Sequence, residues 1–155
     1  DKIGIEKADE ASPVSYQMCI KYRNTKLSTL SKPKYVKILR VWAELVQQVM
    51  QASPEYGHNF SIGFVVDEHR TAEMYYCCDR NTYYYLIDPT QFSVSKGQET
   101  IFKMFQYAAH EVTHKLLYNH DEAFTSAYHK LCDNYMAKFG LKALRRLSKL
   151  LLTGK

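Results

Sequence analysis

The sequence predicts an α+β fold, in which a small antiparallel or mixed sheet packs on one helix with flanking helices. Three observations support this. In residues 35–52, apolar side chains recur at spacings of three and four, as in an amphipathic helix. In residues 59–87, apolar and polar residues alternate in short runs separated by turn residues, as in strands. Helical periodicity returns from residue 100 onward. With 155 residues, the chain is expected to form one domain.

The first third of the chain predicts one well-defined element. Residues 1–13 are polar and are interpreted as a linker or a disordered N-terminal segment, so the domain itself is expected over residues 14–155. Residues 14–22 are compatible with either a strand or a short helix. The helix over residues 35–52 is expected to stop at Ser53-Pro54, because proline cannot continue a helix.

The remaining elements follow in two groups. Strands are predicted over residues 59–66, 72–78 and 82–87, and their short links favour antiparallel pairing of consecutive strands. Helices are predicted from Thr100 through the histidine-rich stretch described below, over residues 121–139 and over residues 141–152. Gly140 is the expected C-cap between the last two.

Composition limits the class of protein. Hydrophobic residues make up 46% of the chain, and no apolar run approaches the roughly 18 residues of a membrane span, so no membrane partner is expected. The four cysteines show no C-x-x-C pair and no disulfide rhythm, which favours buried thiols in a reducing compartment. An intracellular location is therefore expected, in the cytoplasm, the nucleoid or the nucleus. The chain begins with Asp1 and shows no signal peptide, which favours a fragment of a longer protein.

Positive charge is concentrated in two segments. The net charge is +5, yet no acidic residue lies between Glu10 and Glu44 or after Asp133. Residues 21–40 and 138–155 therefore form basic segments that can attract nucleic acid or another polyanion. The alternative is that they are ordinary solvated helix faces.

One stretch carries the chemistry. His110-Glu111-Val112-Thr113-His114 has the pattern H-E-x-x-H, and His120 follows six residues later. On a helix, His110 and His114 lie one turn apart on the same face, where two imidazoles can share one zinc ion. Glu111 lies one step off that face and can reach water bound to the metal. A helix end soon after His114, with Asn119 as a suitable break, would return His120 as third ligand and leave one position open for catalysis.

Other interpretations of these residues remain open. The histidines can be surface or core residues of an ordinary helix, and Glu122 can replace His120 as a ligand. Asp121 and Glu122, with Asp88 as a further candidate, are predicted to orient the histidines from outside the ligand set. His129 is expected to be a surface residue, and the oxyanion donor cannot be chosen among thirteen tyrosines.

Residues 108–124 resemble the zincin metallopeptidases. The spacing H-E-x-x-H-x5-H is similar to that of metzincins, although Leu117 stands where those proteins have glycine. Asn119-His120-Asp121-Glu122-Ala123-Phe124 resembles the N-H-x-x-x-F of small bacterial metal-dependent hydrolases of the YgjP, WLM and SprT kind. The resemblance implies one catalytic Zn²⁺ on His110, His114 and His120, Glu111 as general acid/base, and Phe124 packed under the site. It also implies a zincin-like layout, with the metal helix across a small sheet and a cleft beside an edge strand. We expect residues 82–87 to form a wall of this cleft.

The predicted function is that of a zinc metallopeptidase, a hydrolase that cleaves peptide bonds of a peptide or protein substrate with a Glu-assisted zinc-bound water. The alternative is a non-catalytic zincin-like module that contacts protein or nucleic acid through the basic segments. Hydrolysis of a non-peptide amide would use the same residues.

Overall fold

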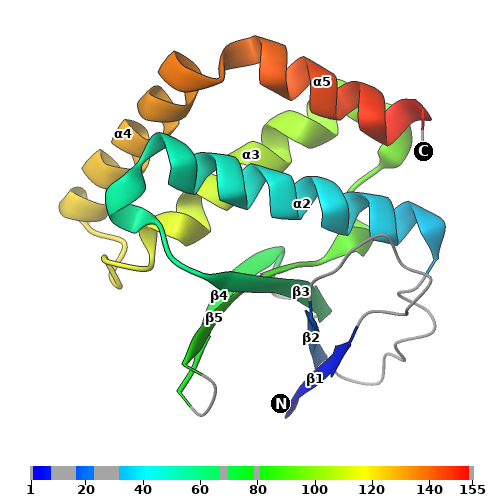
Figure 1. Ribbon diagram of the computed structural model, residues 1–155, viewed down its shortest axis with the longest axis horizontal. Helices are drawn as coiled ribbons and strands as arrows, with labels where there is room; N and C mark the ends of the chain where they lie inside the picture. Colours follow the sequence, from blue (N-terminus) through cyan, green and yellow to red (C-terminus); the bar gives the residue numbers. More distant parts are fainter. Residues whose placement is uncertain (1, 8–16, 23–31, 67–69, 79–80, 154–155) are drawn as a thin grey trace.

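The computed structural model describes residues 2–7, 17–22, 32–66, 70–78 and 81–153. In this part of the chain, helices and a mixed sheet form an α+β fold, as predicted. The helices lie together on one side of the sheet, and α3 (Gly97–Thr113), which carries most of the H-E-x-x-H motif, crosses above it (Figure 1).

The helices match their predicted positions closely. They are α2 (Pro33–Ala52), α3 (Gly97–Thr113), α4 (Glu122–Lys138) and α5 (Gly140–Thr153). Pro33 occupies the first turn of α2, where the missing N–H is not needed, and Pro54 follows its end. The C-cap of α4 is Phe139 and not Gly140 as expected; Gly140 is the first residue of α5 and has a φ of +71°, a left-handed conformation that glycine adopts readily. Short 3-10 turns occupy Pro54–Tyr56 (η1), Pro89–Gln91 (η2) and Val94–Lys96 (η3).

The sheet contains more strands than predicted. Its strands are β1 (Lys2–Lys7), β2 (Gln17–Tyr22), β3 (Phe60–Val66), β4 (Ala72–Cys77) and β5 (Thr82–Ile87), in the order β1-β2-β3-β5-β4. The expectation of a linker at residues 1–13 is wrong for Lys2–Lys7, which pairs antiparallel with β2. Asp1 and residues 8–16 lie outside the described part. In the segment 14–22, which the sequence left open between strand and helix, Gln17–Tyr22 form a strand that pairs parallel with β3.

One predicted pairing is wrong. The hairpin of β4 and β5 is antiparallel, as expected, but β3 pairs with β5 in parallel and not with β4. Burial explains the order. Leu86 and Ile87 of β5 are fully buried, so this strand takes the interior position, whereas β4 lies at the edge.

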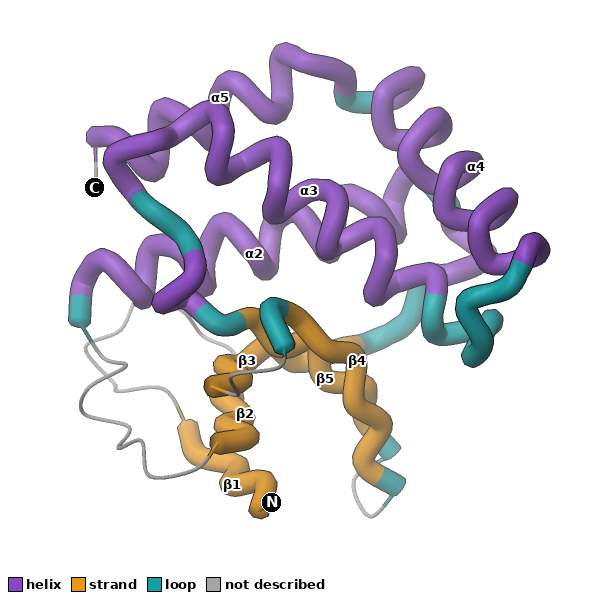
Figure 2. The backbone as a smooth tube through the Cα atoms, turned by 180° about the vertical axis from the view of Figure 1, so that it is seen from behind, coloured by secondary structure: helices purple, strands orange, loops and turns teal. Residues whose placement is uncertain are grey.

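The core joins the helices to the sheet and thereby positions α3. Trp42 of α2 is fully buried and donates its indole N–H to the carbonyl of Tyr85 in β5, with the two atoms 3.0 Å apart. Ala108 and Val112 of α3 are also fully buried in this core. Figure 2 shows the far side, where α3 ends near β4 and the loop to α4 begins. Since one side of α3 is buried, the side that carries His110 and His114 faces outward.

Candidate metal centre

The side-chain nitrogens of three histidines converge on one point. Nε2 of His120 lies 3.2 Å from Nε2 of His110 and 2.9 Å from Nε2 of His114. Nitrogen ligands about 2.0–2.1 Å from a tetrahedral zinc ion stand about 3.3 Å apart, so these separations are close to those that zinc imposes. The predicted ligand set is thus brought together, and it forms a group that could hold a metal ion.

The chain reverses direction between His114 and His120 to make this convergence. The α-helix ends at Thr113, and the N–H groups of Leu116 and Leu117 both bond to the Thr113 carbonyl in a closing turn. The expected helix end soon after His114 is confirmed. Asn119 does not supply a left-handed break, because among the described non-glycine residues only Asn81 has a positive φ. The tight turn after Thr113 makes the reversal instead.

A backbone carbonyl orients His114. Nδ1 of His114 lies 3.1 Å from the carbonyl oxygen of Leu117, which can only accept, so Nδ1 carries the proton. The lone pair on Nε2 is therefore left for a metal. Sequence reasoning did not identify this contact, because it depends on the turn and not on a side-chain type.

The acidic residues predicted to orient the histidines have other roles. The Asp121 carboxylate is the N-cap of α4 and accepts from the N–H of Phe124 at 3.0 Å. The Asp88 carboxylate caps η2 by accepting from the N–H of Thr90. Glu122 is exposed in the first turn of α4. We call His110, His114 and His120 the histidine triad. Within the described part of the chain, none of the three carboxylates bonds to an imidazole of this triad.

Phe124 packs under the site, as the resemblance implied. Its ring centre lies 4.9 Å from that of His110, 4.7 Å from that of His114 and 5.0 Å from that of His120. The side chain is buried. One aromatic ring therefore supports all three imidazoles, and the Asp121 cap fixes the backbone from which it projects.

Glu111 is buried beside the triad. Its Oε1 accepts from the backbone N–H of Met74 in β4 at 3.0 Å, while Oε2 lies 3.9 Å from Nε2 of His110. Burial raises the pKa of Glu111 to about 7, and the charge of Glu73 adds to this, whereas the Met74 N–H and Arg70 oppose it. A carboxyl group with this pKa can both take and release a proton near neutral pH.

His110 and His114 favour their neutral form, because the pKa of each is lowered. Burial, followed by the proximity of His114 and His120, lowers the pKa of His110 to about 4. Burial also lowers the pKa of His114, and His120 adds to this effect. Metal ligation requires neutral imidazole, so protons do not compete strongly for these nitrogens at neutral pH.

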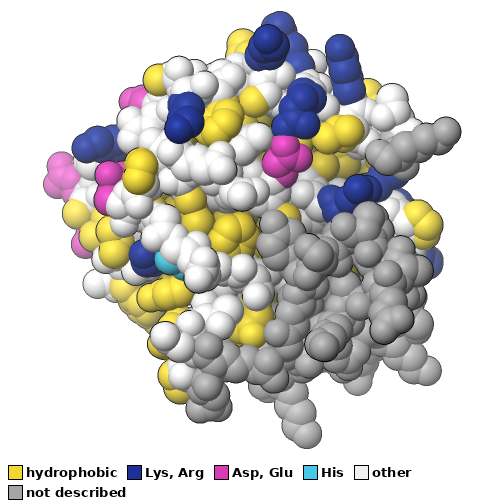
Figure 3. Space-filling model, viewed as in Figure 1, with side chains coloured by type: hydrophobic (Ala, Val, Ile, Leu, Met, Phe, Trp, Pro, Cys, Tyr) yellow, Lys and Arg dark blue, Asp and Glu magenta, His cyan; other side chains and the backbone are white. Residues whose placement is uncertain are grey.

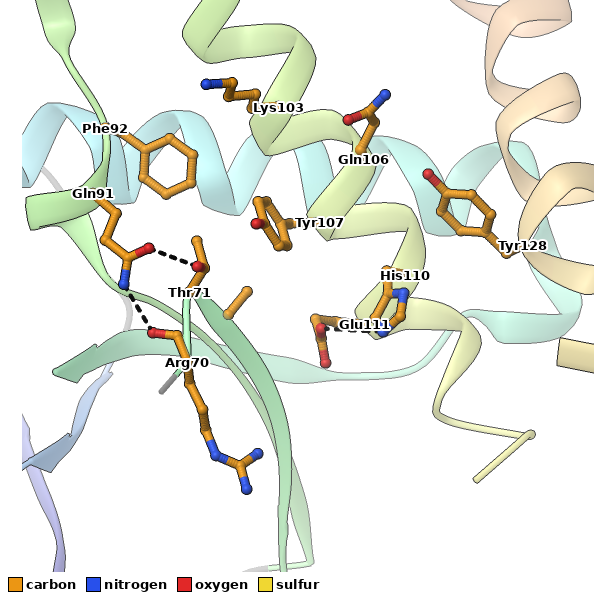
Figure 4. A pocket seen from close by; sticks show the side chains of 11 residues that line it. Arg70, Thr71, Gln91, Phe92, Lys103, Gln106, Tyr107, His110, Glu111 and Tyr128 are labelled. Carbon is orange, nitrogen blue, oxygen red and sulfur yellow. Dashed lines mark hydrogen bonds and ion pairs between the residues drawn. The ribbon is translucent and has the colours of Figure 1, made fainter. Parts of the chain in front are cut away.

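Two adjoining hollows open on the triad. One, of about 450 Å³, runs beside β4 and is lined by Arg70, Ala72, Glu73 and Met74 together with the triad. The other, of about 730 Å³, lies along α3 and is lined by Phe92, Gln106, Tyr107 and Tyr128 among others (Figure 4). The guess that residues 82–87 form the cleft wall is wrong. Tyr84 and Tyr85 of β5 are buried inside the sheet, and the edge strand β4 forms the wall.

Two tyrosines and one arginine also lie close to the triad. Tyr118 is exposed and lines the hollow beside β4, and the Tyr128 ring centre lies 6.2 Å from that of His110. These are the tyrosines that flank the triad. Arg70 forms an ion pair with the buried Glu73 at 3.1 Å on the cleft wall. His129 is exposed, as expected.

Comparisons with known proteins found no match to this chain. No family model matches the chain, and no curated protein or solved structure is significantly similar to it. In the part of the chain that the structure describes, none of the helices combines the length and apolar character of a membrane span. Cys132 is half-buried, as a thiol of the core would be, but Cys78 is exposed, contrary to the expectation of burial.

Proposed function

We propose that this protein is a zincin-like, zinc-dependent metallopeptidase. The observation that carries the proposal is the convergence of three Nε2 atoms, 2.9 and 3.2 Å apart, with the buried carboxylate of Glu111 beside them. Three neutral imidazoles suit zinc, and a three-residue ligand set leaves a coordination position for the reaction. When bound, zinc would act as a Lewis acid that activates water and polarises the scissile carbonyl group.

Glu111 is the proton carrier in this proposal. Its Oε1 is held by the Met74 N–H, so Oε2 is the oxygen directed toward the triad. Oε2 takes the proton of the attacking water and then passes it to the leaving nitrogen. A purely structural metal site has no need of a buried carboxylate at this position, and burying one without a function is unfavourable.

The edge of β4 supports a peptide as the substrate. The Thr71 carbonyl accepts from the N–H of Asp88 in the hairpin, whereas the Met74 N–H points to Glu111. Since antiparallel pairing alternates along a strand, the main-chain groups of Ala72, Met74 and Tyr76 point away from β5. Glu111 occupies the Met74 N–H, and an extended peptide can add to the remaining main-chain groups of this edge next to the triad. A small amide would leave most of the cleft empty.

Hydrolysis of an unfolded protein tests the proposal. Zinc-loaded wild type should cleave denatured casein or a mixed peptide library, with new termini detected by mass spectrometry. Glu111→Gln should bind zinc normally and lose at least about 100-fold in rate, the range expected for loss of general acid–base catalysis. Glu122→Gln is the matched control, since it alters an exposed glutamate near the site and should stay close to wild type. Equal activity of Glu111→Gln and wild type would reject the proposal.

The alternative is a non-catalytic module that keeps the fold for binding. It predicts no cleavage by any loaded variant and no dependence on Glu111. The same experiment therefore separates the two functions.

A further inference from the structure

Folding brings together the two helices that carry the described parts of the basic segments, residues 32–40 and 138–153. Helix α5 packs beside α2, although the two are about a hundred residues apart in sequence (Figure 1). The guanidinium group of Arg146 in α5 bonds to the carboxylate of Glu44 in α2. Lys37, Arg40 and Leu150 line a shallow groove between the helices. We call the outer surface of these two helices the α2–α5 face.

Cations dominate this face. Lys34, Lys37 and Arg40 lie on the N-terminal half of α2, and all are exposed or half-buried. Exposed cations on α5 form the second row: Lys142, Arg145, Arg146 and Lys149. In the described residues of both helices, the single acidic residue is Glu44, and its charge is matched by Arg146. The face therefore carries an excess of positive charge with no further carboxylate on the two helices to neutralise it.

Figure 3 shows the same separation of charge. Dark blue side chains gather over the upper part of the molecule, where α5 lies, and magenta side chains lie mainly toward α4. The histidine triad lies at the C-terminal end of α3, close in sequence to the acidic residues Asp121 and Glu122. A polyanion is thus attracted to the α2–α5 face and away from the triad.

We propose that the α2–α5 face binds the phosphodiester backbone of a nucleic acid. Cations three or four residues apart on a helix stand roughly 5–6 Å apart, so each helix presents a row that can follow a chain of phosphates. The arginines add planar donors that suit phosphate oxygens. This binding is independent of the proposed peptidase activity.

The buried side of α5 favours nucleic acid over a membrane surface. An amphipathic helix that binds a bilayer must insert its apolar side between lipids. In this protein, Leu144, Leu147 and Leu151 are fully or almost fully buried in the core. Only the charged side of α5, with scattered exposed leucines, remains for a partner.

Fluorescence anisotropy tests the proposal with two labelled probes, a 20-nucleotide single strand and a 20-base-pair duplex, over a range of salt concentrations. Two double variants remove one row each, Lys37→Gln/Arg40→Gln on α2 and Lys142→Gln/Lys149→Gln on α5. Lys103→Gln on α3 together with Lys130→Gln on α4 removes the same charge outside the two basic segments and is the matched control. Glutamine is a good helix former, so the helices should be preserved. Thermal unfolding and zinc content confirm that each variant is folded.

Each row variant should weaken binding at least about tenfold at low salt, and should make the slope of log K against log salt shallower by about 1.4 for the single strand or 1.8 for the duplex. The control should match wild type, and zinc content should be unchanged in all variants. The probe that binds more tightly shows whether the ligand is single-stranded or double-stranded. The proposal is overturned if neither probe binds, if either row variant behaves like wild type, or if the control weakens binding equally. Binding to phosphatidylserine vesicles without binding to either probe would also overturn it.

Discussion

The backbone N–H of Met74 donates to Oε1 of Glu111 at 3.0 Å, across 37 positions of sequence. This bond ties the edge strand β4 to the metal-motif helix α3. It fixes one carboxylate oxygen and leaves the other facing the triad. The edge that we expect to receive substrate is therefore also the element that positions the general base.

Removing this N–H should impair catalysis without removing the metal. Met74→Pro eliminates the donor, and proline is tolerated on an edge strand where the N–H points away from the sheet. Because hydrogen bonds to charged groups contribute about 1.5–3 kcal/mol, we expect kcat to fall by about 10- to 100-fold with zinc content unchanged. Met74→Ala is the matched control, since it removes most of the same side chain but keeps the N–H that bonds to Glu111. A Met74→Pro enzyme with wild-type kcat would show that the bond has no role in turnover.

Phe124 should affect metal affinity through packing alone. Its ring lies within 5.0 Å, centre to centre, of all three imidazoles. Phe124→Ala should destabilise the metal-free protein by about 3 kcal/mol, as large-to-small substitutions of buried aromatics do. We also expect zinc affinity to fall at least tenfold, measured by competition with a chelator, because the histidines lose their support. Phe124→Leu keeps most of the side-chain volume, so its stability and its zinc affinity should lie between those of wild type and Phe124→Ala. Wild-type affinity in a folded Phe124→Ala protein would contradict this role.

Asp121 should behave as a helix cap and not as a partner of the histidines. Asp121→Ala removes the acceptor for the Phe124 N–H and should cost about 1 kcal/mol of stability. Asparagine caps helices about as well as aspartate, so Asp121→Asn should retain both stability and zinc affinity. The comparison is made by denaturant unfolding and zinc titration. If Asp121→Asn lost zinc as strongly as Asp121→Ala, the negative charge itself would be needed at the site.

The buried Glu111 should make the metal-free protein less stable as pH rises. Folding raises its pKa from 4.5 to about 7, so the folded state favours the protonated carboxyl group. This contribution is fully present below pH 4.5 and is lost as pH rises through 7. Between pH 5 and pH 8, wild type should lose about 2–3 kcal/mol of unfolding free energy relative to Glu111→Gln. Denaturant unfolding of both proteins with a chelator present measures the difference, and the subtraction removes the histidine contributions. A difference that is constant with pH would show that Glu111 is not desolvated.

Sequence reasoning reached the triad because its parts are local. His110 lies in the last turn of α3, His114 caps its end and His120 follows six residues later, so helical geometry and spacing were sufficient. The same locality explains why α2, α4 and α5 were predicted to within a few residues from their apolar periodicity.

The parts that failed depend on distant contacts. The alternation in residues 59–87 located the strands but could not show that β5 would lie between β3 and β4, because that order depends on which strand the helices cover. Met74 carries no polar side chain, so nothing in its residue type pointed to a bond with Glu111. The strand at Lys2–Lys7 was missed because its pairing with β2, rather than its own composition, makes it a strand.

Metal content is the most direct test of the central claim that His110, His114 and His120 hold one catalytic zinc beside Glu111. Elemental analysis of purified wild type, Glu111→Gln, His120→Ala and, as a control, the exposed His129→Ala should give about one zinc per chain for all but His120→Ala, which should lose most of its metal. Wild type that carries no zinc, and takes up none when it is supplied, would contradict the account.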